Sequence, residues 1–176
     1  MLKGYRAKDM KMILVIIAMA LSLGCSAQKK IDLGKLGLKE DIDSLIQGVP
    51  NIHKGALFDR TDMYSYGVSG NTVFYLGDFL PAHVELLCYK GKLAGYAFKM
   101  KTFADEQKLE QYLKANYKLV PAEQKARDVI STMYSDSNIL IEFDAIEKAS
   151  FEKGMRGYLN VRRLDFAAEY ERLMKQ

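Results

Sequence analysis

The sequence predicts an α+β fold in which helices pack on one face of an antiparallel sheet. Two observations indicate it. Strand-like runs are joined by hairpin-length connections, and apolar stripes at helical spacing lie before, between and after the groups of strands. The expected order is one helix, four strands, a second helix, three strands and a final helix.

The first helix is expected near residues 38–47, where apolar residues recur at helical spacing and acidic residues occupy the first turn. Gly48 and Pro50 follow as a stop signal. The apolar positions are Leu38, Ile42, Leu45, Ile46 and Val49.

Four strands are expected next, over residues 62–68, 72–76, 83–89 and 93–101. The last two flank a short Lys-Gly-Lys connection, which is typical of a hairpin. In the last run, apolar residues alternate with lysines, as expected for a sheet with one face in water.

Thr102 is placed to cap a second helix. Three further strands are expected over residues 129–134, 139–143 and 157–162, and Asp165 is expected to cap the final helix. Strands followed by a helix thus occur twice, which hints at a duplication, although the two halves share few identical residues.

The N-terminal segment has the order of residues found in export signals. A basic stretch ending at Lys11 precedes the 13 residues Met12–Gly24, and small residues follow. This run is too short to cross a bilayer, which takes about 20 apolar residues. We therefore expect residues 1–27 to be a signal peptide that is removed, residues 28–34 a tether and residues 35–176 a single α+β domain.

Two processing routes remain open. Small residues at Cys25-Ser26-Ala27 favour cleavage before Gln28, which would release a soluble periplasmic or secreted protein. Alternatively, Leu21–Cys25 resembles a bacterial lipobox, with Ser22 in place of a large apolar residue, and predicts lipidation of Cys25. Both routes take the protein out of the cytoplasm, and only a lipid at Cys25 would attach it to a membrane.

The net charge of +4 is concentrated in the same segment. Residues 1–27 hold four basic residues and one acid, which accounts for +3 and leaves +1 for the rest of the chain. If translation begins at Met10–Met12, residues 1–9 are not part of the precursor. A nearly neutral body offers no basic face to polyanions, so nucleic acid is not expected as a partner.

Few residues are available for redox or metal chemistry. Cys88 is alone once Cys25 is removed or lipidated, and its alternation with apolar residues is typical of a buried thiol. No Cys-x-x-Cys or His-x-x-x-His spacing occurs, so only His53, His83 and Cys88 remain as strong ligands. We expect no metal site and no cofactor.

The segment Leu33–Ile42, closed by Gly48-Val49-Pro50, resembles the opening of small exported envelope proteins of the β-lactamase-inhibitor-like and outer-membrane-assembly lipoprotein kind. In those proteins a glycine turn leads into a short helix that ends in Gly-x-Pro, and antiparallel strands follow. The run Val84–Leu93 is similar to a hairpin common in them. The resemblance covers about 30 residues, and this chain departs from it by a longer sheet region without a clear second helix opening. It implies a non-catalytic protein-binding or scaffold role.

A hydrolase-type site built on His83 is one alternative. Asp78 lies five residues earlier and could orient the imidazole as a base. Cys88 lies five residues later, so in an extended strand it points to the opposite face and cannot serve as the nucleophile. The simpler interpretation is a surface histidine near a turn aspartate.

Four aromatic residues on neighbouring strands form the predicted binding site: Tyr64, Tyr66, Phe74 and Tyr75. Exposed tyrosines offer rigid contact area to a protein or a sugar. Phe74 and Tyr75 are adjacent in a strand and face opposite ways, so one of these rings is expected outside the core. The other interpretation is that the aromatic residues pack beneath the helices.

These observations predict an exported, non-enzymatic module that binds or scaffolds an envelope protein. Two alternatives stay open. One is the small hydrolase that uses His83. The other is a small-ligand carrier with a cleft between sheet and helices, which requires a cavity of about 300 Å³ or more.

Overall fold

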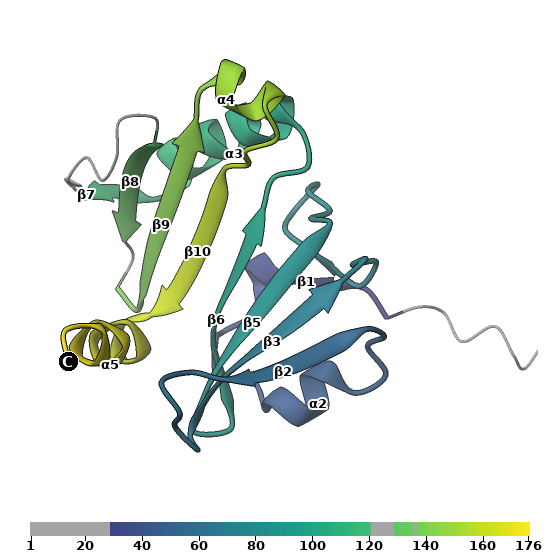
Figure 1. The fold of residues 1–176 in the computed structure, drawn as a ribbon, viewed down its shortest axis with the longest axis vertical. Helices are drawn as coiled ribbons and strands as arrows, with labels where there is room; N and C mark the ends of the chain where they lie inside the picture. Colours follow the sequence, from purple (N-terminus) through teal and green to yellow (C-terminus); the bar gives the residue numbers. More distant parts are fainter. Residues whose placement is uncertain (1–28, 121–128, 136) are drawn as a thin grey trace, which may run out of the picture.

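The computed structural model describes residues 29–120, 129–135 and 137–176. Its main feature is an eight-stranded sheet in which all neighbouring strands are antiparallel (Figure 1). From one edge to the other the strands are β2 (Ile52–Ala56), β3 (Met63–Ser69), β5 (His83–Tyr89), β6 (Lys92–Lys99), β10 (Tyr158–Arg163), β9 (Ile139–Ile146), β8 (Val129–Ser135) and β7 (Lys118–Val120).

Each half of the chain builds its strands from one edge of the sheet towards the middle. The first half ends on β6 and continues into α3 (Phe103–Asn116), and the second half ends on β10 and continues into α5 (Leu164–Met174). Strands β6 and β10 pair at the centre, with Tyr96 opposite Val161. The order of four strands and a helix is therefore the same in both halves, apart from the short α4 (Lys148–Glu152) between β9 and β10.

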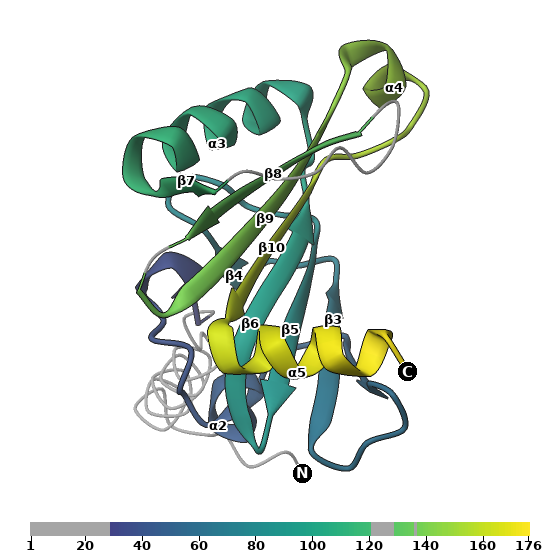
Figure 2. The same ribbon diagram turned by 90° about the vertical axis from the view of Figure 1, so that its left-hand side faces the viewer.

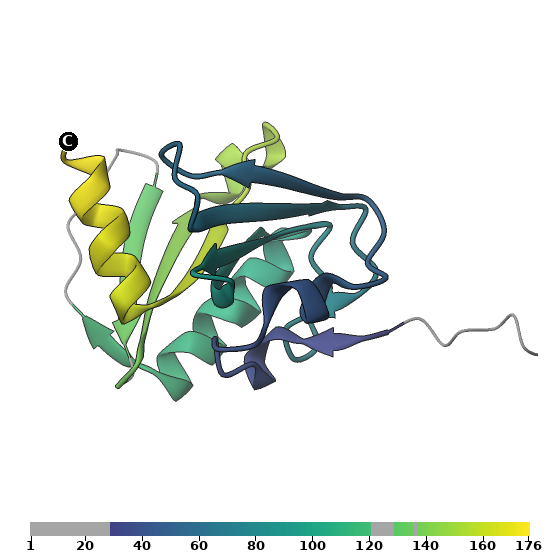
Figure 3. The ribbon, with the colours of Figure 1, turned by 90° about the horizontal axis from the view of Figure 1, so that it is seen from below.

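The two long helices lie on opposite faces of the sheet (Figures 2 and 3). Leu109 and Leu113 of α3 are buried in the larger core cluster, together with Phe98 and Phe143. Phe166 of α5 belongs to a separate cluster on the other face. That cluster also contains Met63, Leu87 and Ala94.

The predicted antiparallel α+β sheet is confirmed, whereas the predicted order of elements is not. Strand β2 was not expected because none of its residues is fully buried, and β7 is a three-residue edge strand. Of the expected strand 72–76, only β4 (Phe74–Tyr75) forms. It lies outside the main sheet and pairs in parallel with β1 (Ile31–Asp32).

The prediction that all helices pack on one face is wrong for α5. Leu86, Leu87 and Cys88 are consecutive and all buried, so this part of β5 is covered on both faces. Such a continuous apolar run needs a cover on the second face. α5 provides it because the helix begins directly after β10, without a connecting loop.

The helix α2 (Ile42–Ile46) lies within the expected range and is followed by Gly48 in the left-handed region, with φ of 77°. Residues 31–34, which the sequence assigned to a tether, are part of the fold: Ile31 belongs to β1, and Leu33 is 1% exposed. The predicted signal peptide, residues 1–27, and the lipidation site at Cys25 lie outside the described residues. No helix in the described ranges is long and apolar enough to cross a membrane.

Candidate functional site

One face of the sheet carries polar side chains on four adjacent strands, β5, β6, β10 and β9. These side chains alternate with the core residues that pack beneath α3, so they point to the opposite face. α5 covers one part of this face (Figure 2). We call the remaining part the open face; its residues are Gly67 on β3, His83 and Glu85 on β5, Ala97 and Lys99 on β6, Tyr158, Asn160 and Arg162 on β10, and Glu142 and Asp144 on β9.

A hollow of about 440 Å³ lies on the open face. It is lined by His83, Glu85, Ala97, Phe98, Lys99 and Tyr158, and we call it the sheet hollow. The strand register explains its shape, because Ala97 lies opposite Glu85 on one side and Asn160 on the other. A methyl group between two long side chains leaves space above the strand.

Gly67 sets the position of His83 on this face. The two residues lie on neighbouring strands, and a Cβ atom added to Gly67 would lie 3.4 Å from Cε1 of His83. The imidazole therefore packs over the bare backbone of β3. With Glu85 two residues further along β5, the histidine and the carboxylate lie on the same face.

Tyr158 stands among the charged groups of the open face. Burial, followed by the negative charge of Glu85, raises the pKa of Tyr158 to about 12. Asp144, directly opposite on β9, raises it further, whereas Arg162 acts in the other direction. The phenol is therefore neutral at pH 7 and can donate a hydrogen bond.

A buried ion pair forms the other end of the open face. Nη2 of Arg162 donates a hydrogen bond of 2.8 Å to Oε2 of Glu142, and Arg162 is only 7% exposed. The guanidinium also lies 5.6 Å from the ring centroid of Tyr170 on α5. Burial lowers the pKa of Arg162, and the negative charge of Glu171 acts in the opposite direction.

Three buried polar atoms of the open face make no hydrogen bond to any described residue: Oδ1 of Asp144, Oδ1 of Asn160 and Nε of Arg162. Buried polar atoms of this kind are uncommon, and each calls for an explanation. A fourth such atom, the hydroxyl oxygen of Tyr134, lies in the core cluster beneath α3. The gathering of the other three on one face marks this face as a candidate functional surface.

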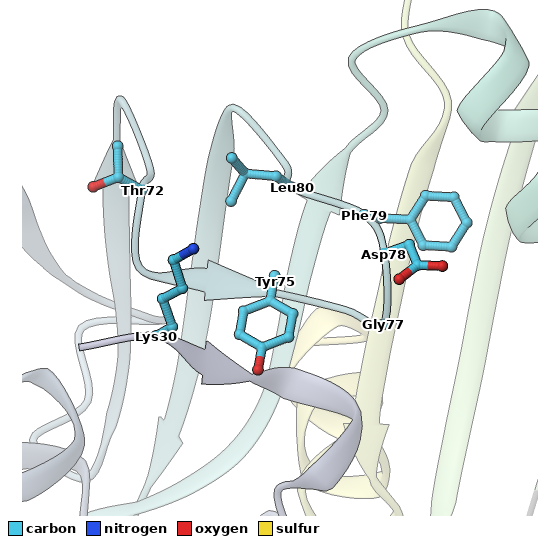
Figure 4. A pocket seen from close by; sticks show the side chains of 7 residues that line it. All are labelled: Lys30, Thr72, Tyr75, Gly77, Asp78, Phe79 and Leu80. Carbon is cyan, nitrogen blue, oxygen red and sulfur yellow. The ribbon is translucent and has the colours of Figure 1, made fainter. Parts of the chain in front are cut away.

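A second hollow, of about 410 Å³, lies beside β4 (Figure 4). It is lined by Lys30, Thr72, Tyr75, Gly77, Asp78, Phe79 and Leu80, and we call it the loop pocket. In Figure 4 the side chains of Lys30, Tyr75 and Leu80 surround the hollow, whereas Phe79 points away from Lys30.

Asn71 holds this loop in place. It is 5% exposed, and its Nδ2 donates hydrogen bonds to the carbonyl oxygens of Phe74 and Pro81. Its Oδ1 accepts hydrogen bonds from the backbone N–H groups of Val73 and Phe74. The loop can therefore present Leu80, which is 54% exposed, on a fixed backbone.

The four predicted aromatic residues occupy different environments. Phe74 is completely buried and Tyr66 is 5% exposed, so both belong to the core. Tyr64 is half-buried, with its ring centroid 6.4 Å from that of Tyr66 and 3.8 Å from Nζ of Lys54. Tyr75 is half-buried and lines the loop pocket.

The structure separates the residues of the hydrolase alternative. His83 lines the sheet hollow, whereas Asp78 lines the loop pocket. Cys88 is buried in the core on the opposite face from His83, and burial raises the pKa of its thiol. His53, the other histidine, is exposed on β2.

One hollow lies where the ligand-carrier alternative expects a cleft, between the sheet and the segment before α2. It measures about 260 Å³ and is lined by residues that include Leu33, Tyr96, Tyr117 and Val161. This is below the lower limit of about 300 Å³ for typical ligand pockets.

Glu85, Lys99 and Tyr158 were not expected as site residues. The signal for them is an alternation of polar side chains, at residues 83 and 85 on one strand and 158, 160 and 162 on another. Such positions are typical of a solvated face. Only the pairing of β6 with β10 brings the two series together.

Among the described residues, no group of three or more His, Cys, Asp or Glu side chains is placed to hold a metal ion. Comparison of the chain with models of known protein families, with curated proteins and with solved structures returned no match.

Proposed function

We propose that the protein is a non-enzymatic binding module that docks a polypeptide partner on the open face of its sheet. The observation that carries the proposal is the concentration of a 440 Å³ hollow and three buried polar atoms without described partners on this one face. A partner docked on this face would fill the hollow, exclude water from the side chains around it and offer hydrogen-bonding groups to those that are partly exposed.

The character of the open face favours a polypeptide over a small molecule. Its side chains extend over four strands and combine an aromatic residue, charged groups and an amide. Protein interfaces use tyrosine and arginine as anchors with a polar rim around them. The rigid antiparallel framework keeps these side chains in place before binding, which lowers the entropic cost of association.

The N-terminal segment supports a place for this module outside the cytoplasm, in the periplasm, secreted or anchored to the envelope through Cys25. An envelope protein is then the partner class. The resemblance of Leu33–Ile42 and Val84–Leu93 to small exported envelope proteins supports the same role.

The test is site-specific photocrosslinking in cells that produce the full chain. A photoreactive phenylalanine replaces Lys99, which is exposed beside the sheet hollow, or Lys108, which is exposed on α3. We expect one discrete adduct from position 99, suppressed by excess unlabelled protein, and none from position 108. An adduct from position 108 without one from position 99 would place the interface on the helical side and contradict the proposal.

A further inference from the structure

We infer that the sheet hollow receives a basic side chain, lysine or arginine, presented by the partner. This inference rests on the proposed function and specifies the chemistry of its contact. It is carried by the positions of Glu85 and Tyr158, which line the hollow, and of Asp144, which lies beside Tyr158 on β9.

The register places these groups around one volume. Tyr158 lies opposite Lys99 on β6 and opposite Asp144 on β9. Glu85 lies opposite Ala97, which is two residues from Lys99 and on the same face of β6. Because Ala97 contributes only a methyl group, nothing fills the space between the Glu85 carboxylate and the Tyr158 ring. That space has the size of a long side chain.

The charges around this volume are not balanced by the fold. Glu142 is neutralised by Arg162 at 2.8 Å, but neither Glu85 nor Asp144 makes an ion pair with a described residue. Both carboxylates act on Tyr158, whose pKa they raise. The carboxylate of Glu85 therefore lines the hollow without an ion-pair partner among the described residues, next to a neutral aromatic ring, a combination that attracts an ammonium or guanidinium group.

Lys99 carries a positive charge beside the hollow and would repel an incoming basic group. It lines the hollow, but it is exposed and makes no ion pair with a described residue. Its long side chain can turn into solvent when another cation enters. Lys99 should therefore weaken binding of a basic group, whereas Glu85 should strengthen it.

The test is a titration of the folded protein with N-acetyl-arginine amide, followed by amide chemical shifts. N-acetyl-citrulline amide, which has nearly the same shape without the charge, is the control ligand. We expect saturable shifts at Ala97, Lys99 and Tyr158 with arginine and none with citrulline.

Four variants test in which direction each charge changes the affinity for arginine. Glu85→Gln and Asp144→Asn should each weaken arginine binding by about three- to fivefold, and Lys99→Gln should tighten it by about two- to threefold, as expected for partly exposed charge pairs. Asp43→Asn, on the exposed side of α2 and away from the open face, should leave it unchanged. Shifts at unaltered backbone positions report whether each variant remains folded.

Equal binding of arginine and citrulline, or equal effects of Glu85→Gln and Lys99→Gln, overturns the inference. The result is separable from the proposed function. A crosslinked partner at position 99 without arginine binding refutes the basic side chain alone, whereas arginine binding without a position-99 adduct refutes docking of a partner at this face.

Discussion

The carboxylate of Glu106, in α3, accepts a hydrogen bond of 3.1 Å from the backbone N–H of Gly157, the residue that precedes β10. Its other oxygen accepts a bond of 2.7 Å from the backbone N–H of Ile146, at the end of β9. Glu106 is 2% exposed. One side chain thus fixes the helix to two strands of the other half, and with them the positions of Asp144 and Tyr158.

Replacing Glu106 tests this connection. In Glu106→Gln an amide N–H₂ group faces one of the two backbone donors, so one buried N–H loses its acceptor. We expect the free energy of unfolding to fall by about 1–3 kcal/mol, measured by urea denaturation. Glu110→Gln, which removes only the partly exposed pair with Lys114 at 2.6 Å, should cost less than about 1 kcal/mol. Equal losses in the two variants would contradict the structural role of Glu106.

The same residue predicts a dependence of stability on pH. Burial raises the pKa of Glu106 above its ordinary value of 4.5, against the opposing effect of its two backbone hydrogen bonds. The contribution of Glu106 to the free energy of unfolding is then complete at pH values below its pKa in the unfolded state. It decreases as the pH rises through its pKa in the folded state. The difference in unfolding free energy between wild type and Glu106→Gln should therefore become smaller as the pH rises from 4.5. A difference that grows with pH would mean that the folded state lowers this pKa.

Gly95 should tolerate no side chain. A Cβ atom at this position of β6 would collide with the backbone carbonyl of Val161 on β10, at the junction between the two halves. We expect Gly95→Ala to lower the free energy of unfolding by about 2–4 kcal/mol, because neither backbone can move freely. Gly55→Ala on β2 is the matched control, since its Cβ would meet no atom within 4 Å. Similar melting temperatures for the two variants would argue against the close approach of β6 and β10.

Several features of the fold were predictable, and the reasons are local. Thr102 accepts a hydrogen bond from the backbone N–H of Asp105, as expected for a helix cap. The hairpin between β5 and β6 follows from alternation and a glycine turn. These signals lie within a few residues of the structure that they specify.

The parts that were not predictable depend on distant segments. The open face exists because β6 pairs with β10, and no local pattern in Lys92–Lys99 or Tyr158–Arg163 identifies the other strand as its partner. The position of α5 depends on Leu87 and Ala94 facing away from α3, and a register shift between Leu87 and Cys88 alters this part of the alternation.

Arg162 and Glu142 should behave as a coupled unit. Arg162→Met removes the guanidinium that pairs with the largely buried carboxylate of Glu142, which should lower the free energy of unfolding by about 3–5 kcal/mol. Adding Glu142→Leu removes that carboxylate as well and should restore part of the loss. Lys92→Met, at the exposed pair with Asp41, should cost at most about 1 kcal/mol. A double variant less stable than Arg162→Met would show that the two residues do not form such a unit.

The central claim is that the open face is the docking surface, and blocking that face tests it most directly. Lys99→Cys, modified with a bulky maleimide, is compared with Lys108→Cys modified in the same way; the native Cys88 is buried and does not compete. The account predicts that the modified position 99 loses capture of the partner identified by crosslinking, while the modified position 108 captures it as the wild type does. Full capture with position 99 blocked would contradict the account.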